Sequence, residues 1–185
     1  EQAEAQGLVP MPSFDQTLVQ GVGTYGMELL QAVPDLDTVY VPIGMGSGVC
    51  GVISAREALG LKTKVVGVVA ENAPTYALSF EAGEPVSTNS SETMADGLAV
   101  RIPDAAALGT ILKGAERVVA VSEDEIKAAI RHYYTDTHNL VEGAGAATLA
   151  ALLKERDAMA GRKVGVIVSG GNIDTAVYRD ILAGG

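Results

Sequence analysis

A run of small residues, Gly44-Met45-Gly46-Ser47-Gly48, follows a strongly apolar stretch of the chain. Without a Cβ, the backbone of such a loop can turn its N–H groups towards an anion, and the first turn of a following helix adds unsatisfied N–H groups and partial positive charge. The pattern therefore predicts a phosphate-binding loop between a strand and a helix. No Lys-Ser or Lys-Thr pair closes the glycine run, which excludes a mononucleotide P-loop.

The loop alone leaves two kinds of phosphate ligand open. Residues 46–51, Gly-Ser-Gly-Val-Cys-Gly, match the dinucleotide pattern. Glu71 follows about 20 residues later, at the end of the next apolar run, where a ribose-binding acid would lie. The loop is therefore compatible with NAD or with a simple phosphate monoester.

A second turn of small polar residues, Ser169-Gly170-Gly171-Asn172, also follows an apolar run. In a parallel sheet this turn would open at the same edge as the glycine loop. A hydroxyl at Ser169 can donate a hydrogen bond to a neutral ring nitrogen, whereas a carboxylate there would keep that nitrogen protonated. We therefore expect the two turns to face one crevice.

The elements that must position these turns alternate along the chain. Runs rich in Val and Ile predict buried strands at residues 38–43, 64–70, 116–121 and 163–168. Helical spacing of apolar residues predicts helices at residues 48–59, 74–80, 104–113, 122–134 and 143–156. This alternation predicts an α/β fold, a mostly parallel sheet with helices on both faces, in a single domain over residues 1–185.

Two local features refine this plan. Ser122 and Glu125 have the spacing of a capping box, which marks the start of the fourth helix. Residues 84–100 are polar and weakly periodic, which predicts a loop across an open face of the domain.

Composition narrows the classes of partner. The chain has 185 residues, is 48% hydrophobic and carries 13 basic against 23 acidic side chains, for a net charge of -10. This charge disfavours nucleic acid and anionic membranes. The single Cys50 excludes an internal disulfide framework and indicates a reducing compartment such as the cytoplasm. The first ten residues lack a signal-peptide pattern, and the apolar runs are too short to span a bilayer.

Six sequence blocks in one order resemble the pyridoxal-phosphate enzymes of fold type II, the tryptophan-synthase-β-like group, and in particular threonine and serine dehydratases and serine racemase. The blocks lie at residues 20–24, 44–48, 93–99, 119–126, 142–146 and 169–172 and span nearly the whole chain. The resemblance implies that the chain forms most of the large domain of such an enzyme. It also implies β-elimination from a β-hydroxy amino acid such as threonine or serine, by a homo-oligomer, most simply a dimer.

The resemblance also implies roles for individual residues. Backbone N–H groups of Gly44, Met45, Gly46, Ser47 and Gly48 would bind the phosphate of pyridoxal 5′-phosphate, Ser169 would face the pyridine nitrogen, Glu142 would lie close to the ring, and Asp96 and Gly97 would border the substrate. Met45 stands in a loop that is usually all glycine, which is tolerable if its φ is negative.

Two departures from the family limit these roles. The Schiff-base lysine of the family lies in a Ser-x-Lys-x-Arg-Gly context that this sequence lacks, and the six lysines present have the character of surface charges. We therefore expect the C-terminal part of a longer enzyme, without the small domain, without a catalytic residue of its own and inactive by itself. Val69 and Thr75 stand where metal-dependent relatives place Glu and Asp, which predicts no divalent cation at that position.

Two other classes of protein remain open. One is an NAD-binding oxidoreductase domain that uses Glu71, and the other is a non-catalytic fragment that binds phosphate or self-associates. The remaining reactive side chains have simpler interpretations. Cys50 is expected to be a buried helix residue, and His132 and His138 are expected at the surface.

Overall fold

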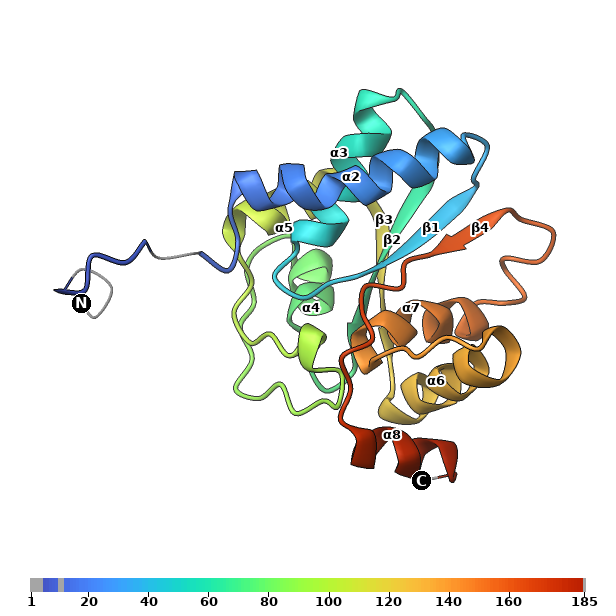
Figure 1. Cartoon of the computed structure of the whole chain (residues 1–185). Coiled ribbons are helices and arrows are strands. Elements are labelled where there is room, and N and C mark those ends of the chain that lie inside the picture. Colours follow the sequence, from blue (N-terminus) through green and yellow to red (C-terminus); the bar gives the residue numbers. More distant parts are fainter. Residues whose placement is uncertain (1–4, 10–11, 185) are drawn as a thin grey trace.

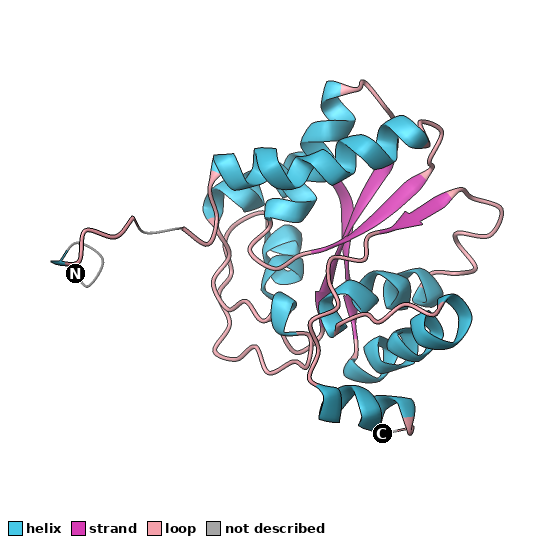
Figure 2. Ribbon diagram, in the orientation of Figure 1, coloured by secondary structure: helices cyan, strands magenta, loops and turns pink. Residues whose placement is uncertain are grey.

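The computed structural model describes residues 5–9 and 12–184, so the first ten residues, examined above for a signal peptide, lie partly outside the described residues. Four strands form one sheet in the order β3-β2-β1-β4, and every neighbouring pair is parallel. The strands are β1 (Thr38–Pro42), β2 (Lys64–Ala70), β3 (Ala115–Val121) and β4 (Val164–Val166). The predicted α/β class and parallel sheet are confirmed (Figure 2).

Helices cover both faces of the sheet, as predicted (Figure 1). One layer contains α2 (Gln16–Ala32), α3 (Ser47–Ala58), α4 (Thr75–Ala82) and α5 (Ala105–Gly114). The other contains α6 (Glu123–Thr137) and α7 (Gly143–Lys154), with α8 (Thr175–Leu182) packed beside α6. Among the described residues, no helix is long and apolar enough to cross a membrane.

Strand β1 lies inside the sheet and supplies both halves of the core. Val39 and Val41 pack with the α2–α5 layer, whereas Tyr40 points to the α6 and α7 side, and all three are fully buried. Alternation of side chains along a strand explains this division. The buried position of β1 also explains why its sequence is a continuous apolar run.

Helix α2 was not expected from the sequence, because Gly21, Gly23 and Gly26 give that segment the composition of a loop. Two of these glycines permit close packing instead. A Cβ on Gly51 of α3 would lie 2.9 Å from the Cα of Gly23, and a Cβ on Gly26 would lie 3.1 Å from the Cα of Val52. Helix α8 was also missed, because it is short and largely exposed.

Strand β4 is shorter than the predicted residues 163–168. The Ile167 amide still donates to the backbone carbonyl of Tyr40 in β1, at 3.0 Å. The Ile167 carbonyl, however, accepts a hydrogen bond from the hydroxyl of Thr148 in α7, also at 3.0 Å. Val168 and Ser169 then leave the sheet and are exposed. The edge strand ends early because Pro42, the next residue of β1 to face it, has no N–H to donate to the Ile167 carbonyl, and the Thr148 hydroxyl bonds that carbonyl instead.

The capping box at the start of α6 is confirmed. The Glu125 amide donates to the Ser122 hydroxyl at 3.2 Å, and the Ser122 amide donates to the Glu125 carboxylate at 2.7 Å. The segment 84–100 is irregular, as predicted, apart from the 3-10 turn η1 (Asp96–Leu98).

Candidate functional site

The glycine loop joins the end of β1 to the start of α3. Gly46 is the N-cap residue of α3 and has a φ of 101°, in the left-handed region that favours glycine. A Cβ on Gly46 would lie 2.8 Å from the Cβ of Ala107, and a Cβ on Gly44 would collide with the carbonyl of Gly97. Met45 has a negative φ and so avoids this strain. Among the described residues, His138 is the one non-glycine residue with a positive φ.

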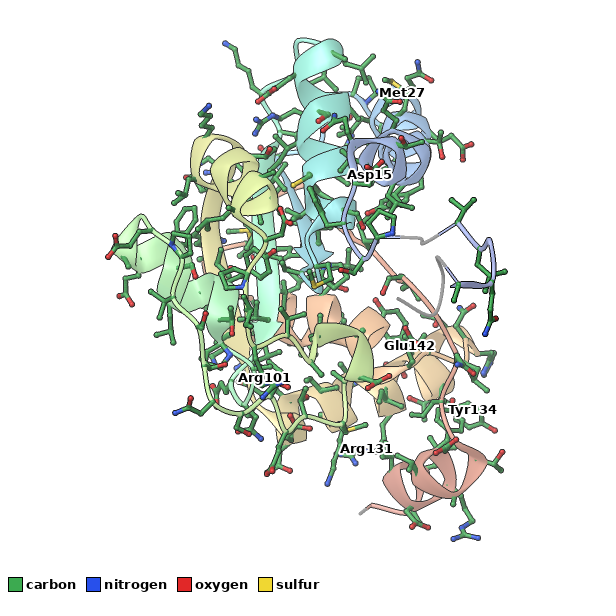
Figure 3. All side chains as sticks on the ribbon, turned by 90° about the vertical axis from the view of Figure 1, so that its left-hand side faces the viewer. Asp15, Met27, Arg101, Arg131, Tyr134 and Glu142 are labelled. Atoms are coloured by element: carbon green, nitrogen blue, oxygen red, sulfur yellow. The ribbon has the colours of Figure 1, made fainter. Side chains whose placement is uncertain are left out.

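The start of α3 leaves its first N–H groups without partners inside the helix. Within the described part of the chain, no side chain caps these groups, in contrast to the starts of α2, α5 and α6, where Asp15, Asp104 and Ser122 accept amide hydrogen bonds (Asp15 is labelled in Figure 3). The amides of Ser47 and Gly48, two half-buried residues, therefore remain available to an external acceptor.

These donors line a cleft of about 750 Å³ at the carboxyl edge of the sheet. The cleft contains the whole glycine loop, Gly97, Glu142 and Ser169, together with residues of α2 such as Thr24 and Tyr25. The expectation that the two turns face one crevice is therefore met. None of the described residues that line this cleft is Lys, Arg or His, so an anion here would rely on backbone amides and hydroxyls.

Glu142 fixes the second turn at the start of α7. Its carboxylate accepts the amide of Asn172 at 3.0 Å, and its own amide donates to the carbonyl of Gly170 at 3.1 Å. A Cβ on Gly170 would lie only 2.6 Å from the Glu142 carboxylate, so a larger residue there would displace that carboxylate from its present position. Figure 3 shows Glu142 beside the segment that leads from β4 to α8. Ser169 directly precedes this fixed turn and lines the same cleft as Glu142.

Asp96 and Gly97 separate in the structure. Gly97 lines the main cleft, whereas Asp96 is exposed and lines a neighbouring hollow of about 410 Å³. Gly97 and Glu142 belong to both hollows. The segment before η1 is tied down, because the Met94 amide donates to the Glu123 carboxylate of α6 at 2.9 Å.

Two tyrosines contact the glycine loop, and neither was predicted from the sequence. The Tyr25 hydroxyl donates to the Gly48 carbonyl at 3.3 Å from the cleft side, and the Tyr76 hydroxyl donates to the Met45 carbonyl at 2.9 Å from the core side. Burial raises the pKa of both phenols to about 12, so both remain donors at neutral pH. Their partners lie 23 and 31 residues away, a separation that no local pattern reveals.

The other candidate residues have structural roles. Glu71 is not among the described residues that line the cleft, and its carboxylate accepts the Lys154 ammonium at 3.2 Å. Cys50 is buried, and burial raises the pKa of its thiol to about 11. His132 and His138 are exposed, His132 next to Asp136 and His138 next to the Tyr134 carbonyl. The interpretations given above for Cys50 and the two histidines are confirmed.

Val69 and Thr75, which stand where metal-dependent relatives place Glu and Asp, are both buried. The Thr75 hydroxyl donates to the Val100 carbonyl at 2.9 Å and lies 3.0 Å from the Thr88 hydroxyl. Over residues 5–9 and 12–184, no cluster of three or more His, Cys, Asp or Glu side chains has an arrangement that could hold a metal ion. Protein hydrogen bonds therefore join α4 to the following loop.

A parallel α/β sheet with a glycine loop at its carboxyl edge is an arrangement in which proteins bind phosphate-bearing cofactors. Residues 1–170 match the family described as "Pyridoxal-phosphate dependent enzyme", whose cofactor is pyridoxal 5′-phosphate. The chain belongs to this family, and its fold is that of the fold type II enzymes. The NAD-binding alternative is not favoured by these relatives.

Individual relatives agree with this assignment. The L-threonine ammonia-lyase of Thermotoga maritima is 36% identical over 171 residues, which cover 92% of this chain and 42% of that protein. The catabolic L-threonine dehydratase of Escherichia coli K12 is 34% identical over 177 residues, 94% of this chain and 54% of that protein. The processed form of threonine deaminase isoform 2 from Solanum lycopersicum superposes with a TM-score of 0.91 at 29% identity, over 98% of this chain and 54% of that one. The chain thus spans about half the length of the curated relatives it matches.

Proposed function

We propose that this chain supplies the phosphate- and ring-binding part of a pyridoxal-phosphate lyase that acts on a β-hydroxy amino acid such as threonine or serine. The net reaction removes the amino group as ammonia and leaves a 2-oxo acid. The observation that carries the proposal is the single cleft lined by the glycine loop and by Ser169. Relatives named threonine ammonia-lyase and threonine dehydratase support the choice of substrate class.

The cleft fits the cofactor in two respects. Gly44 and Gly46 occupy positions where a Cβ would collide with Gly97 or Ala107, so the loop keeps a bare backbone surface. The α3 start that faces the cleft has no side-chain cap among the described residues, so its amides can donate hydrogen bonds to the oxygens of a phosphate. The Gly44, Met45, Gly46, Ser47 and Gly48 segment would hold the phosphate in this way.

The second turn, residues 169–172, would bind the pyridine ring of the cofactor. The Ser169 hydroxyl would donate to the pyridine nitrogen, which keeps that nitrogen neutral, because a hydroxyl does not stabilise a positive charge as a carboxylate does. Glu142 would hold the turn through Asn172 and lie close to the ring. Asp96 and Gly97 would border the substrate side. When bound, pyridoxal phosphate supplies an electron-accepting ring next to the α-carbon of the amino acid.

We further propose that residues 1–185 correspond to part of the large domain, and that the Schiff-base lysine belongs to the portion of the relatives that this chain does not span. The chain by itself would then be inactive. A homodimer in the cytoplasm is the proposed assembly and location, in keeping with a buried, unpaired Cys50. The acidic net charge of -10 supports a small-molecule substrate over nucleic acid.

A chimaera tests the reaction. The chain replaces the matching segment of the Escherichia coli relative, and the purified protein is assayed for 2-oxo acid release from L-threonine and L-serine. We expect cofactor binding and 2-oxo acid formation from at least one of them. A chimaera that folds and binds pyridoxal phosphate but releases no 2-oxo acid would contradict the proposed reaction, and one that folds without binding the cofactor would contradict the proposed site.

A further inference from the structure

Tyr76 of α4 lies behind the glycine loop, on the side away from the cleft. Its side chain is 1% exposed, and it does not line the cleft among the residues described there. Its hydroxyl donates to the Met45 carbonyl at 2.9 Å and accepts the amide of Asp104 at 3.0 Å. Both hydrogen bonds have normal lengths, so the phenol is fixed at both of its roles, as donor and as acceptor.

The first bond determines where the next amide points. The Met45 carbonyl and the Gly46 N–H belong to one trans peptide plane, and the two groups of such a plane point in opposite directions. Tyr76 holds the carbonyl towards the core, so the Gly46 N–H points the other way, towards the cleft that Gly46 lines. Glycine tolerates both orientations of the preceding peptide, so the sequence of the loop alone does not fix this direction.

The second bond connects the loop to a neighbouring helix. Asp104 caps α5 by accepting the amides of Ala106 and Ala107 at 2.9 and 3.0 Å. Ala107 is the residue that leaves no room for a Cβ on Gly46. One hydroxyl therefore orients the loop directly through Met45 and supports the wall behind it through Asp104.

We propose that Tyr76 is a positioning residue for the cofactor phosphate: its hydroxyl locks the Met45–Gly46 peptide in the orientation that presents the Gly46 amide to the anion. This inference rests on the proposed function of the loop and names a side chain outside the six family blocks. Tyr76 touches neither the cleft nor a ligand, so its effect on binding passes through the peptide plane.

Tyr133 of α6 provides a matched control. It is 7% exposed, lies in the other half of the core, and its hydroxyl has no hydrogen-bond partner among the described residues. Both Tyr76→Phe and Tyr133→Phe remove one buried hydroxyl and keep the ring. They differ in whether that hydroxyl is bonded to the loop.

The test titrates the full 185-residue chain with inorganic phosphate and with pyridoxine 5′-phosphate, which has no aldehyde and so does not react with lysines. Calorimetry measures affinity, and the backbone amide signal of Gly46 is followed by NMR in the ligand-free protein. We expect Tyr76→Phe to weaken the affinity for both ligands about tenfold, the scale of one well-placed hydrogen bond, and to shift or broaden the Gly46 signal. Tyr133→Phe is expected to leave both measurements unchanged.

The outcomes separate the two proposals. If the wild type binds neither ligand, the proposed function fails together with this inference. If the wild type binds and Tyr76→Phe binds equally well, or if its Gly46 signal is unchanged, the role of Tyr76 alone is overturned. A lower melting temperature with unchanged affinity would also overturn it, because that is the result of a merely structural role. If Tyr76→Phe does not fold, the Gly46 amide of the wild type decides: a shift of its signal on saturation with inorganic phosphate supports the proposed orientation, and saturable binding with an unchanged Gly46 signal contradicts it.

Discussion

Helices α3 and α6 both follow a parallel strand, yet their first turns are built in opposite ways. The start of α6 satisfies its own donors through the Ser122 and Glu125 capping box. The start of α3 has Gly46 as its N-cap, with no side-chain hydrogen bond among the described residues, and opens into the cleft. In the part of the chain that the structure describes, the helices α4, α7 and α8 also lack a side-chain cap, so what distinguishes the α3 start is the glycine loop in front of it and its place in the cleft, where the proposed function puts the phosphate.

The comparison also separates the physical origins of the two starts. The α6 start depends on side chains that a sequence pattern displays within four residues. The α3 start depends on the absence of a Cβ at Gly44 and Gly46, where Gly97 and Ala107 leave no room for one. It also depends on the hydrogen bond from the Tyr76 hydroxyl to the loop. The conformation of the α3 start thus depends on residues distant in sequence, and the conformation of the capped α6 start depends on residues of its own first turn.

The largest expected effect is on Gly46. Gly46→Ala places a Cβ at a positive φ and against Ala107, so we expect the free energy of unfolding to fall by about 3 kcal/mol. Gly60→Ala is the control, because Gly60 has a φ of 65° with open space around it, and it is expected to cost about 1 kcal/mol. Urea denaturation measures both. Equal losses at the two positions would show that Ala107 does not restrict the loop.

Removal of each serine at the two helix starts tests the comparison directly. Ser122→Ala removes the acceptor of the Glu125 amide and is expected to lower the free energy of unfolding by about 1 kcal/mol. Ser47→Ala removes no cap, and is expected to change it by less than about 0.5 kcal/mol. Thermal unfolding followed by circular dichroism measures the two values. A larger loss for Ser47→Ala would mean that α3 is capped after all.

Ser169 sharpens the comparison within the cleft itself. The Ser169 side chain is exposed, so Ser169→Ala is expected to leave stability unchanged. The affinity for pyridoxine 5′-phosphate should fall about threefold, the scale of one partly exposed hydrogen bond, while the affinity for inorganic phosphate stays the same. Calorimetric titration with the two ligands provides the measurement. An equal loss for both ligands would place the effect at the phosphate and not at the ring.

The smallest expected effect is on the loss of folding stability at low pH. Burial opposes the charge of Glu125, but the Ser122 amide and the Lys154 ammonium outweigh it and hold the pKa of that carboxyl below its usual value. A lowered pKa in the folded state gives stability that is present above the unfolded pKa and is lost as pH falls through the folded pKa. Between about pH 5 and pH 3, the wild type should therefore lose about 0.5 kcal/mol more than Glu125→Gln, a value that already allows for solvent screening. Urea denaturation across this range checks it, and identical pH profiles would remove Glu125 from the account.

The sequence predicted those parts of the molecule whose causes are local. The apolar run of β2 predicted its bounds as observed, and the Ser122 and Glu125 spacing predicted the capping box. The shared crevice followed from the rule that parallel strands end at one edge, and β4 lies beside β1 as that rule requires.

The missed features depend on contacts between distant segments. Helix α2 was overlooked because Gly23 has the character of a loop residue until Gly51 is seen packed against it. Tyr76 was overlooked because its partners, Met45 and Asp104, lie 31 and 28 residues away. Asp96 borders a neighbouring hollow because η1 turns Gly97 and Leu98, but not Asp96, into the main cleft.

The proposed function requires that the free amides of the α3 start bind the phosphate of the cofactor. An NMR titration of the ¹⁵N-labelled chain with pyridoxine 5′-phosphate tests it most directly, with the amides of Gly46, Ser47 and Gly48 compared with those at the capped start of α6. We expect saturable shifts of the three loop amides and of the Ser169 amide, and no change at Ser122 or Glu125. Saturable shifts elsewhere with a silent glycine loop would contradict it.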